Sequence, residues 1–395
     1  MQRVPSRLLV PLVAATFGAT DVSIAADRPP QDAAVVAETE VSDVARLPPP
    51  GPHRLVIGGS LQAGGVRVVD GDKVGLAGTM HSVSGSNVVI DPNGKYYYLA
   101  ETSFARGNRG PRQDYISIYD DQLKLAAEID LPGRLISVPK TQTFDVSSDG
   151  RFGYVFNMQP AASVTVVDLI ARKVATVVEV PGCGLVYSFG PRGFASLCSD
   201  GSAAVAVPAA KGSKYTVART ASFFDAEKDP VFEESPIDRQ TGNALFITYT
   251  GKVIPVALGA TPVFAESWSL QQAAGHPLPS TEPEFLAWRP GGSKLATLHK
   301  ATGRLFVLMH PGAHWTHKQE GTEVWVFDIA ARKRVARFAL KQPMDSIAVT
   351  QDAEPLLFAV GGGPMGSLTV MDARTGETKG ALPGVSGGIL AVHGF

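Results

Sequence analysis

Five stretches of the sequence alternate between apolar and polar residues and end in an aspartate. They are Val66–Asp70, Ile116–Asp120, Val164–Asp168, Val324–Asp328 and Leu368–Asp372. Alternation of this kind is typical of β-strands, and aspartate is a common turn residue. A short polar segment and a second strand-like run follow the aspartates, as at Lys173–Val178 and Arg334–Phe338. The pattern therefore predicts a series of β-hairpins.

The hairpins recur at a nearly constant interval. Successive aspartates are 50, 48, 160 and 44 residues apart, and the long interval is close to three times the others. Two unmarked strands, Ser202–Val207 and Gly251–Val256, fall near the missing positions. Turn-forming phrases at Asp91–Lys95, Ser148–Arg151 and Pro290–Lys294 support the same period. A repeat of this length with about four strands is typical of a propeller blade, so we predict an all-β fold, a seven-bladed β-propeller.

Composition agrees with a globular β protein. Hydrophobic residues make up 44% of the 395 residues and charged residues 18%, which excludes a disordered polyampholyte. The 41 glycines and 29 prolines suit many short strands joined by turns. With 36 basic and 37 acidic residues, the chain has no net field that would attract a nucleic acid or an anionic membrane. A pair of β-sandwiches is the alternative fold, but it does not predict a marker at this interval.

The beginning of the chain is typical of an export signal. Two arginines precede the apolar run Leu8–Phe17, which is too short to span a bilayer, and small residues follow at Ser23–Ala26. We predict a signal peptide over residues 1–26 and a periplasmic mature protein. Residues 27–52 form an N-terminal extended or helical arm, with a short helix at Ala33–Val44 and a proline-rich linker at Pro48–Pro52. The propeller then occupies residues 53–395.

The two cysteines of the chain are Cys183 and Cys198. In an exported protein an isolated pair is more often a disulfide than a redox or metal site, so we predict a disulfide between them. The alternative is two buried free thiols. A loop of about 15 residues closed in this way stabilises the fold by roughly 3 kcal/mol.

Residues that could carry chemistry are few. The densest cluster contains His310, His314 and His317, which in a metal-dependent enzyme would bind zinc or copper. Pro311 and the glycine after it prevent a helix from aligning these imidazoles, so we interpret them as part of an exposed loop in which Trp315 contacts a second chain. No phosphate-binding loop precedes a helix, and neighbouring carboxylates such as Glu233 and Glu234 are assigned no acid–base role. We therefore predict no catalytic, cofactor-binding or metal-binding residue in this chain.

Four phrases carry a resemblance to a known family. They are Arg109–Tyr115, Leu298–Met309, Thr316–Lys318 followed by Glu323–Asp328, and Asp345–Leu357. With the cysteine spacing, they resemble the large (heavy, or alpha) subunit of the quinoprotein amine dehydrogenases, the methylamine and aromatic amine dehydrogenase family. The resemblance runs from about residue 54 to the C-terminus and is closest after residue 285.

The resemblance implies a periplasmic α2β2 heterotetramer. A small, disulfide-rich subunit carries tryptophan tryptophylquinone and the catalytic aspartate, and oxidises a primary amine to an aldehyde and ammonia. Electrons then pass to a copper protein of the amicyanin or azurin type. The present chain would supply the scaffold, the docking face and the outer substrate channel. The family also places an aromatic gate near the substrate entrance, but no aromatic residue at His81–Ser86 matches it.

The substrate and two other functions stay open at this point. Gln351–Leu357 looks more like the methylamine branch and Leu298–His310 more like the aromatic amine branch, with a slight preference for methylamine. The alternatives are an aromatic amine dehydrogenase large subunit, a non-enzymatic periplasmic binding propeller, and the metal-dependent enzyme described above.

Overall fold

The computed structural model describes residues 46–58, 65–83, 85–107, 109–136, 138, 140–209, 214–361 and 366–394. The chain divides into residues 1–45 and a compact unit of residues 46–395. The predicted signal peptide and the helix at Ala33–Val44 lie outside the described residues. The linker at Pro48–Pro52 is described in full and contains no helix or strand.

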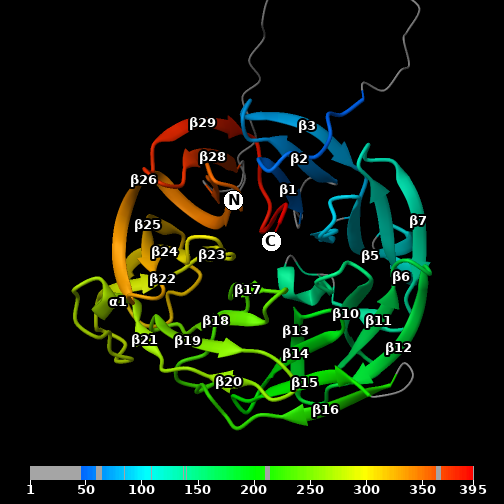
Figure 1. The fold of residues 1–395 in the computed structure, drawn as a ribbon, viewed down its shortest axis with the longest axis horizontal. Coiled ribbons are helices and arrows are strands. Elements are labelled where there is room, and N and C mark those ends of the chain that lie inside the picture. The colour runs from blue at the N-terminus through cyan, green and yellow to red at the C-terminus, as the bar shows by residue number, and fades with distance from the viewer. Residues whose placement is uncertain are drawn as a thin grey trace, which may run out of the picture. The chain divides into compact units, whose positions relative to one another are not determined.

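The compact unit is an all-β propeller, in which antiparallel sheets follow one another around a common centre (Figure 1). One sheet joins β1 (Arg54–Gly58), β2 (Val66–Asp70), β3 (Gly75–Met80) and the late strand β30 (Ile389–Val392). The next contains β4 (Asn87–Ile90), β5 (Tyr96–Arg106), β6 (Arg109–Asp120) and β7 (Leu125–Asp130). A third contains β8 (Arg134–Leu135), β9 (Phe144–Val146), β10 (Phe152–Gln159), β11 (Ser163–Asp168) and β12 (Lys173–Glu179).

The remaining described strands form three more sheets. One contains β13 (Cys183–Phe189), β14 (Gly193–Cys198), β15 (Ala203–Pro208) and β16 (Tyr215–Arg219). Another contains β17 (Ile237–Asp238), β18 (Asn243–Ile247), β19 (Lys252–Ala257), β20 (Val263–Phe264) and β21 (Trp268–Ser269). The last has eight strands: β22 (Ala287–Pro290), β23 (Ala296–His299), β24 (Arg304–Gly312), β25 (Gly321–Asp328), β26 (Lys333–Val349), β27 (Leu356–Gly361), β28 (Ser367–Asp372) and β29 (Thr378–Pro383). The 3-10 turn η1 (Thr141–Thr143) and the helix α1 (Leu270–Ala273) complete the described elements.

The five aspartate-marked strands are β2, β6, β11, β25 and β28, which confirms them as strands. Each aspartate accepts hydrogen bonds from backbone N–H groups of the turn that follows: Asp70 from Asp72 and Lys73, Asp120 from Gln122 and Lys124, Asp168 from Ala171, Asp328 from Ala331, and Asp372 from Arg374. The carboxylate thus fixes the turn into the outer strand, as expected for an Asx-turn. A register shift lies two residues before each aspartate, where a bulge adds twist to the outer hairpin. The repeat in the sequence therefore reflects one type of turn, in which an aspartate accepts hydrogen bonds from the backbone, that recurs in successive hairpins.

The unmarked repeats are strands as well. Ser202–Val207 largely coincides with β15 and Gly251–Val256 with β19, and each has its own outer partner, β16 and β20. The three turn phrases also lie between strands of one sheet, namely β4 and β5, β9 and β10, and β22 and β23.

The hydrophobic core is divided among the spaces between neighbouring sheets. The cluster that contains Tyr97 joins the first two sheets, the one with Phe144 joins the second and third, and the one with Phe194 joins the third and fourth. Further clusters, around Phe246 and the fully buried Trp325, continue the series. The inner strands pack on both sides against neighbouring sheets, so strands such as β9 and β27 are buried along their whole length, whereas the outer strand β16 is mostly exposed.

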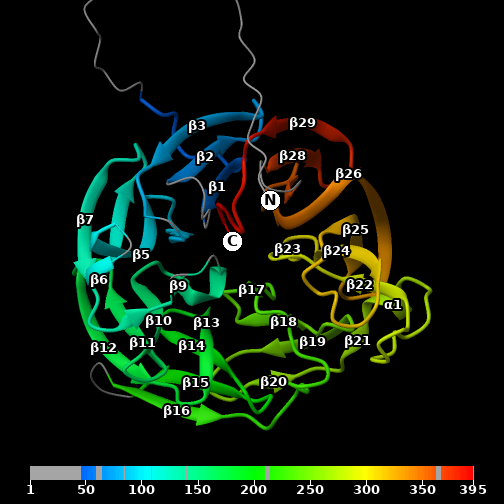
Figure 2. The same ribbon diagram turned by 180° about the vertical axis from the view of Figure 1, so that it is seen from behind.

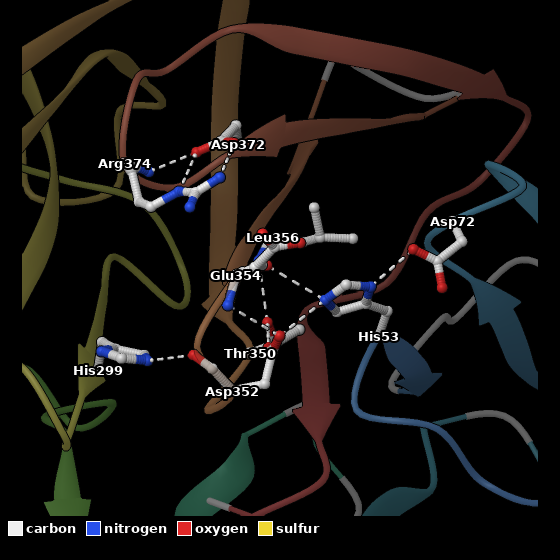
Figure 3. A network of polar contacts seen from close by, with 9 residues as sticks. All are labelled: His53, Asp72, His299, Thr350, Asp352, Glu354, Leu356, Asp372 and Arg374. Carbon is white, nitrogen blue, oxygen red and sulfur yellow. Dashed lines mark hydrogen bonds and ion pairs between the residues drawn. The ribbon is translucent and has the colours of Figure 1, made fainter.

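The ring closes where β1 pairs with β30, so early and late parts of the chain share one sheet (Figure 2). A polar network reinforces this closure (Figure 3). His53, beside β1, contacts Asp72 through Nδ1 at 2.7 Å and Asp352 through Nε2 at 3.0 Å. The backbone oxygen of Glu354 lies 3.2 Å from the same Nε2. Because Asp352 and Glu354 belong to the turn between β26 and β27, this imidazole joins the first sheet to the eight-stranded one.

Candidate functional site

A small cavity of about 50 Å³ lies among residues contributed by strands of several sheets around the centre of the ring. Apolar residues of β4 and β30 line part of it, including Val89 and Leu390. The polar lining comes from η1, from the segment before β17, and from the turn before β23, which contribute Gln142, Glu234 and Lys294. Segments 60 or more residues apart in the sequence thus bring a carboxylate, an amide and an amine to one space.

Glu234 is buried without an ion-pair partner among the described residues. Its Oε1 accepts a hydrogen bond from the Thr141 backbone N–H at 2.8 Å, whereas Oε2 has no hydrogen-bond partner in the described part of the chain. The amide oxygen of Gln142 in the same lining also has none. Burial raises the pKa of Glu234, because a carboxylate loses its hydration there.

Lys294 faces the same cavity. Its Nζ donates a hydrogen bond to the backbone oxygen of Leu390 on β30. Burial lowers the pKa of Lys294 to about 8. The negative charge of Glu234 opposes this decrease, and the positive charge of Arg239 adds to it. The cavity therefore holds an amine and a carboxyl whose pKa values are both moved towards neutrality.

A buried ion pair supports the wall of the cavity. Arg239, which lines it, donates from Nε to Asp145 on β9 at 2.6 Å. The other oxygen of Asp145 accepts from the backbone N–H of Ser188 at 3.1 Å and from its hydroxyl at 2.7 Å. The pair ties three neighbouring sheets together near the centre of the ring.

A larger hollow of about 540 Å³ opens beside this cavity, and Glu234 lines both. Its aromatic side is formed by Phe232, Tyr249 and His317, and the ring of His317 stacks on Tyr249 with centroids 3.9 Å apart. Its polar side contains Lys140, which forms an ion pair with Glu233. Burial lowers the pKa of Lys140 as well. We call this hollow the mouth, and Glu234 lies between it and the small cavity.

The loop of the three histidines lies beside this mouth. Our interpretation of them as an exposed cluster is wrong for two of them: His310 and His314 are buried, and His314 Nε2 lies 3.0 Å from the backbone oxygen of Lys228. The imidazole of His310 is buried against Gly291 and Gly312, which leave room for it because they lack a Cβ. Within the described residues, no group of three His, Cys, Asp or Glu side chains is placed to hold a metal ion.

Trp315 is half exposed, at 50%, and has a φ of 66°. This left-handed conformation is rare for a bulky residue and costs about 1–3 kcal/mol, so the surrounding contacts must hold it. They include the edge of Tyr249, with ring centroids 6.0 Å apart. The role of Trp315 as a contact to a second chain stays a prediction.

Other residues considered in the sequence are also placed. Cys183 and Cys198 form a disulfide and pair directly across β13 and β14. The loop that starts at His81 is fixed by the Tyr119 hydroxyl, which donates to the His81 backbone oxygen at 2.5 Å, and by Glu101, which accepts from Val83 N–H at 2.9 Å. Sequence reasoning missed a Gly-x-Ser-x-Gly string at Gly384–Gly388, but this string leads into strand β30 and not into the helix that follows a serine nucleophile.

Comparison with known proteins identifies the family. The family described as methylamine dehydrogenase heavy chain matches residues 61–388. The methylamine dehydrogenase heavy chain of Methylobacillus flagellatus is 30% identical over 321 residues, which is 80% of this chain and 78% of that protein. This chain belongs to the methylamine dehydrogenase heavy chain family. The heavy chains of Methylorubrum extorquens and Paracoccus versutus are 28% and 29% identical, over 78% of this chain and 74% and 71% of theirs.

Solved structures support the fold alone. A periplasmic gluconolactonase of Pseudomonas aeruginosa superimposes with a TM-score of 0.56 at 14% identity, covering 83% of this chain and 94% of that one. A 6-phosphogluconolactonase-like protein of Bacteroides uniformis gives 0.55 at 11% identity, with 85% and 98% covered. These structural similarities confirm that this heavy-chain family member is a β-propeller. Among its described residues no helix has the length and apolar character needed to cross a bilayer.

Two features of the site were missed by sequence reasoning. Glu234 was assigned no role, because a carboxylate beside another carboxylate is common on any surface. Lys294 lay within a turn phrase and was interpreted only as a turn residue. No local signal distinguishes either, since their burial depends on strands contributed by other sheets.

Proposed function

We propose that this chain is the large subunit of a periplasmic amine dehydrogenase that depends on tryptophan tryptophylquinone. It would assemble with a small, quinone-bearing subunit as an α2β2 heterotetramer. The assembly would oxidise a primary amine to an aldehyde and ammonia and pass electrons to an amicyanin- or azurin-like copper protein. Membership of the heavy-chain family over residues 61–388 is the observation that carries this proposal.

The chain itself would perform no bond-making step of amine oxidation. That chemistry belongs to the quinone of the small subunit. The large subunit would provide a rigid docking face and the outer substrate channel, and would keep water away from the quinone pocket. The Cys183–Cys198 disulfide suits an oxidising compartment, as does the proposed signal peptide over residues 1–26.

We count the propeller as seven-bladed. The count is supported by β26, which has 17 residues. Its first half pairs with β25, and its second half pairs with β27. If β26 is the outer strand of one blade and the inner strand of the next, the eight-stranded sheet supplies two blades. The proposed organisation is then an arm over residues 27–52 and seven blades over residues 53–395.

We place the docking face at the mouth around Trp315. The half-exposed indole, its strained backbone and its contacts to Tyr249 and His317 support this choice. Trp315→Ala should weaken association with the small subunit at least tenfold, because buried tryptophans dominate interface energies. Ile170→Ala is the matched control, since Ile170 is 75% exposed on the turn between β11 and β12. Equal affinity of the two variants would refute this placement.

The function is tested by purifying the protein from its native host. We expect it to co-purify with a small, cysteine-rich chain that carries a quinone chromophore, and to be inactive alone. A stable monomer without a chromophore would favour the binding propeller instead. We favour methylamine over an arylalkylamine as substrate, and the ratio of kcat/KM for methylamine and 2-phenylethylamine measured on the complex decides between them.

A further inference from the structure

The small cavity contains the groups that a protein needs to bind a carbonyl compound covalently. Lys294 places an amine in it, Glu234 places a carboxyl without an ion-pair partner in it, and the rest of its lining includes apolar residues such as Ile90 and Ala348. A cavity of about 50 Å³ accommodates a molecule of a few heavy atoms, since one water needs only about 10–15 Å³ on this measure. Amines in such surroundings are the ones that form Schiff bases in proteins.

We propose that Lys294 binds a small aliphatic aldehyde as a reversible imine, with Glu234 as the neighbouring proton donor and counter-ion. The source of the aldehyde rests on the proposed function, since amine oxidation releases one. The larger hollow lined by Tyr249 and His317 leads to Glu234 and would be the way in.

The chemistry balances without an oxidant or reductant. The neutral amine of Lys294 adds to the carbonyl carbon, the C=O π bond breaks, and one proton moves from the nitrogen to the oxygen to give a neutral carbinolamine. Glu234 in its acid form then protonates the hydroxyl, which leaves as water while the C=N bond forms. Hydrolysis is the exact reverse. The resulting iminium would be a cation beside the Glu234 carboxylate, whose Oε2 has no other hydrogen-bond partner among the described residues.

Charges around the amine support this reactivity. Glu234 favours the protonated amine and Arg239 disfavours it, while burial is the largest influence and lowers the pKa of Lys294 to about 8. About a tenth of Lys294 is then neutral at pH 7 and about half at pH 8, whereas an ordinary lysine with a pKa of about 10.4 is neutral in fewer than one molecule in a thousand at pH 7.

The test is reductive alkylation of the full chain, without any partner subunit. The protein is treated briefly with limiting acetaldehyde and sodium cyanoborohydride, and the ethylated lysines are quantified by peptide mass mapping. Lys73, whose side chain is 79% exposed, is the internal reference. We expect Lys294 to be ethylated about tenfold faster than Lys73 at pH 7, and its rate to level off above pH 8 while that of exposed lysines keeps rising about tenfold per pH unit.

Variants separate the roles of the two residues. Lys294→Arg should remove this ethylation and leave Lys73 unchanged. Glu234→Gln should slow the ethylation of Lys294 several-fold at pH 9, where most of the amine is neutral in either protein, because the variant lacks the carboxylate that stabilises the iminium cation. Ethylation of Lys294 no faster than that of Lys73, or preferential ethylation of Lys140 at the mouth, overturns the proposal. Because this assay needs no quinone, its failure is distinct from failure of the chain to co-purify with a small subunit.

Discussion

The imidazole at the ring closure makes stability depend on pH in a defined direction. Both ring nitrogens of His53 face acceptors, namely the carboxylates of Asp72 and Asp352 and the backbone oxygen of Glu354. Only the doubly protonated imidazolium can donate from both nitrogens at once. Burial acts to lower the pKa of His53, but its hydrogen bonds to Asp72 and Asp352 and their charges outweigh burial, so this pKa is raised.

The magnitude follows from exposure. The Asp72 side chain is 69% exposed, so its ion pair contributes only about 0–1 kcal/mol. The side chains of His53 and Asp352 are 16% and 22% exposed, so a charge-assisted bond between them is worth about 1–2 kcal/mol. We therefore expect His53→Gln to lower the free energy of unfolding by about 2 kcal/mol at pH 6, which for a chain of this size lowers Tm by about 2–3 °C.

The pH dependence is the decisive observation. A raised pKa in the folded state means that the stabilisation is complete below the ordinary histidine pKa of about 6.5 and is lost as the pH rises through the folded value. The difference in urea midpoint between the wild type and His53→Gln should be largest near pH 6 and should fade towards pH 8.5. His81→Gln, at an exposed histidine, is the matched control and should show no such trend. A difference that stays flat or grows with pH would refute the reasoning.

Three further changes test the rest of the fold. The double variant Cys183→Ser/Cys198→Ser should lose about 3 kcal/mol of unfolding free energy, because it opens a loop with a sequence separation of 15. Thermal melts with and without reductant check this, and the double variant should be insensitive to reductant. Asp145→Asn removes the carboxylate charge that Arg239 contacts on the buried strand β9 and should cost about 2–4 kcal/mol by urea unfolding, whereas Asp121→Asn, outside this network, should cost less than about 0.5 kcal/mol. Gly201→Ala should lower the free energy of unfolding by about 2–4 kcal/mol, because φ is +79° and a Cβ would meet the Phe224 backbone oxygen. Gly107→Ala, with φ +70° but open space around it, should lower it by only about 1 kcal/mol. Equal losses in the two variants would contradict the steric argument.

The repeat could be predicted because its signal is local. Asp70, Asp168 and Asp372 each bond to backbone groups within four residues, so turn and strand appear together in the sequence. The ring of sheets follows from repeating that unit. The family resemblance rested on segments such as β25 and the turn after β26, where local structure and sequence coincide.

The candidate site could not be predicted for the opposite reason. Glu234 and Lys294 are 60 residues apart in the sequence, and the backbone N–H bonded to Glu234 belongs to Thr141. Only closure of the ring places them around one cavity. The burial of His310 had the same origin, since neighbouring Gly291 comes from a different segment and makes room for the imidazole.

Pairing of β1 with β30 has a consequence for biogenesis. β30, which completes the sheet of β1, is synthesised about 330 residues after β1, so that sheet keeps an unpaired edge until then. An unpaired β-edge is prone to aggregation, so products that terminate before β30 should be removed by quality control or precipitate. A fusion tag placed directly after Val392 would hinder the pairing of β30 with β1, whereas a flexible spacer before the tag would permit it.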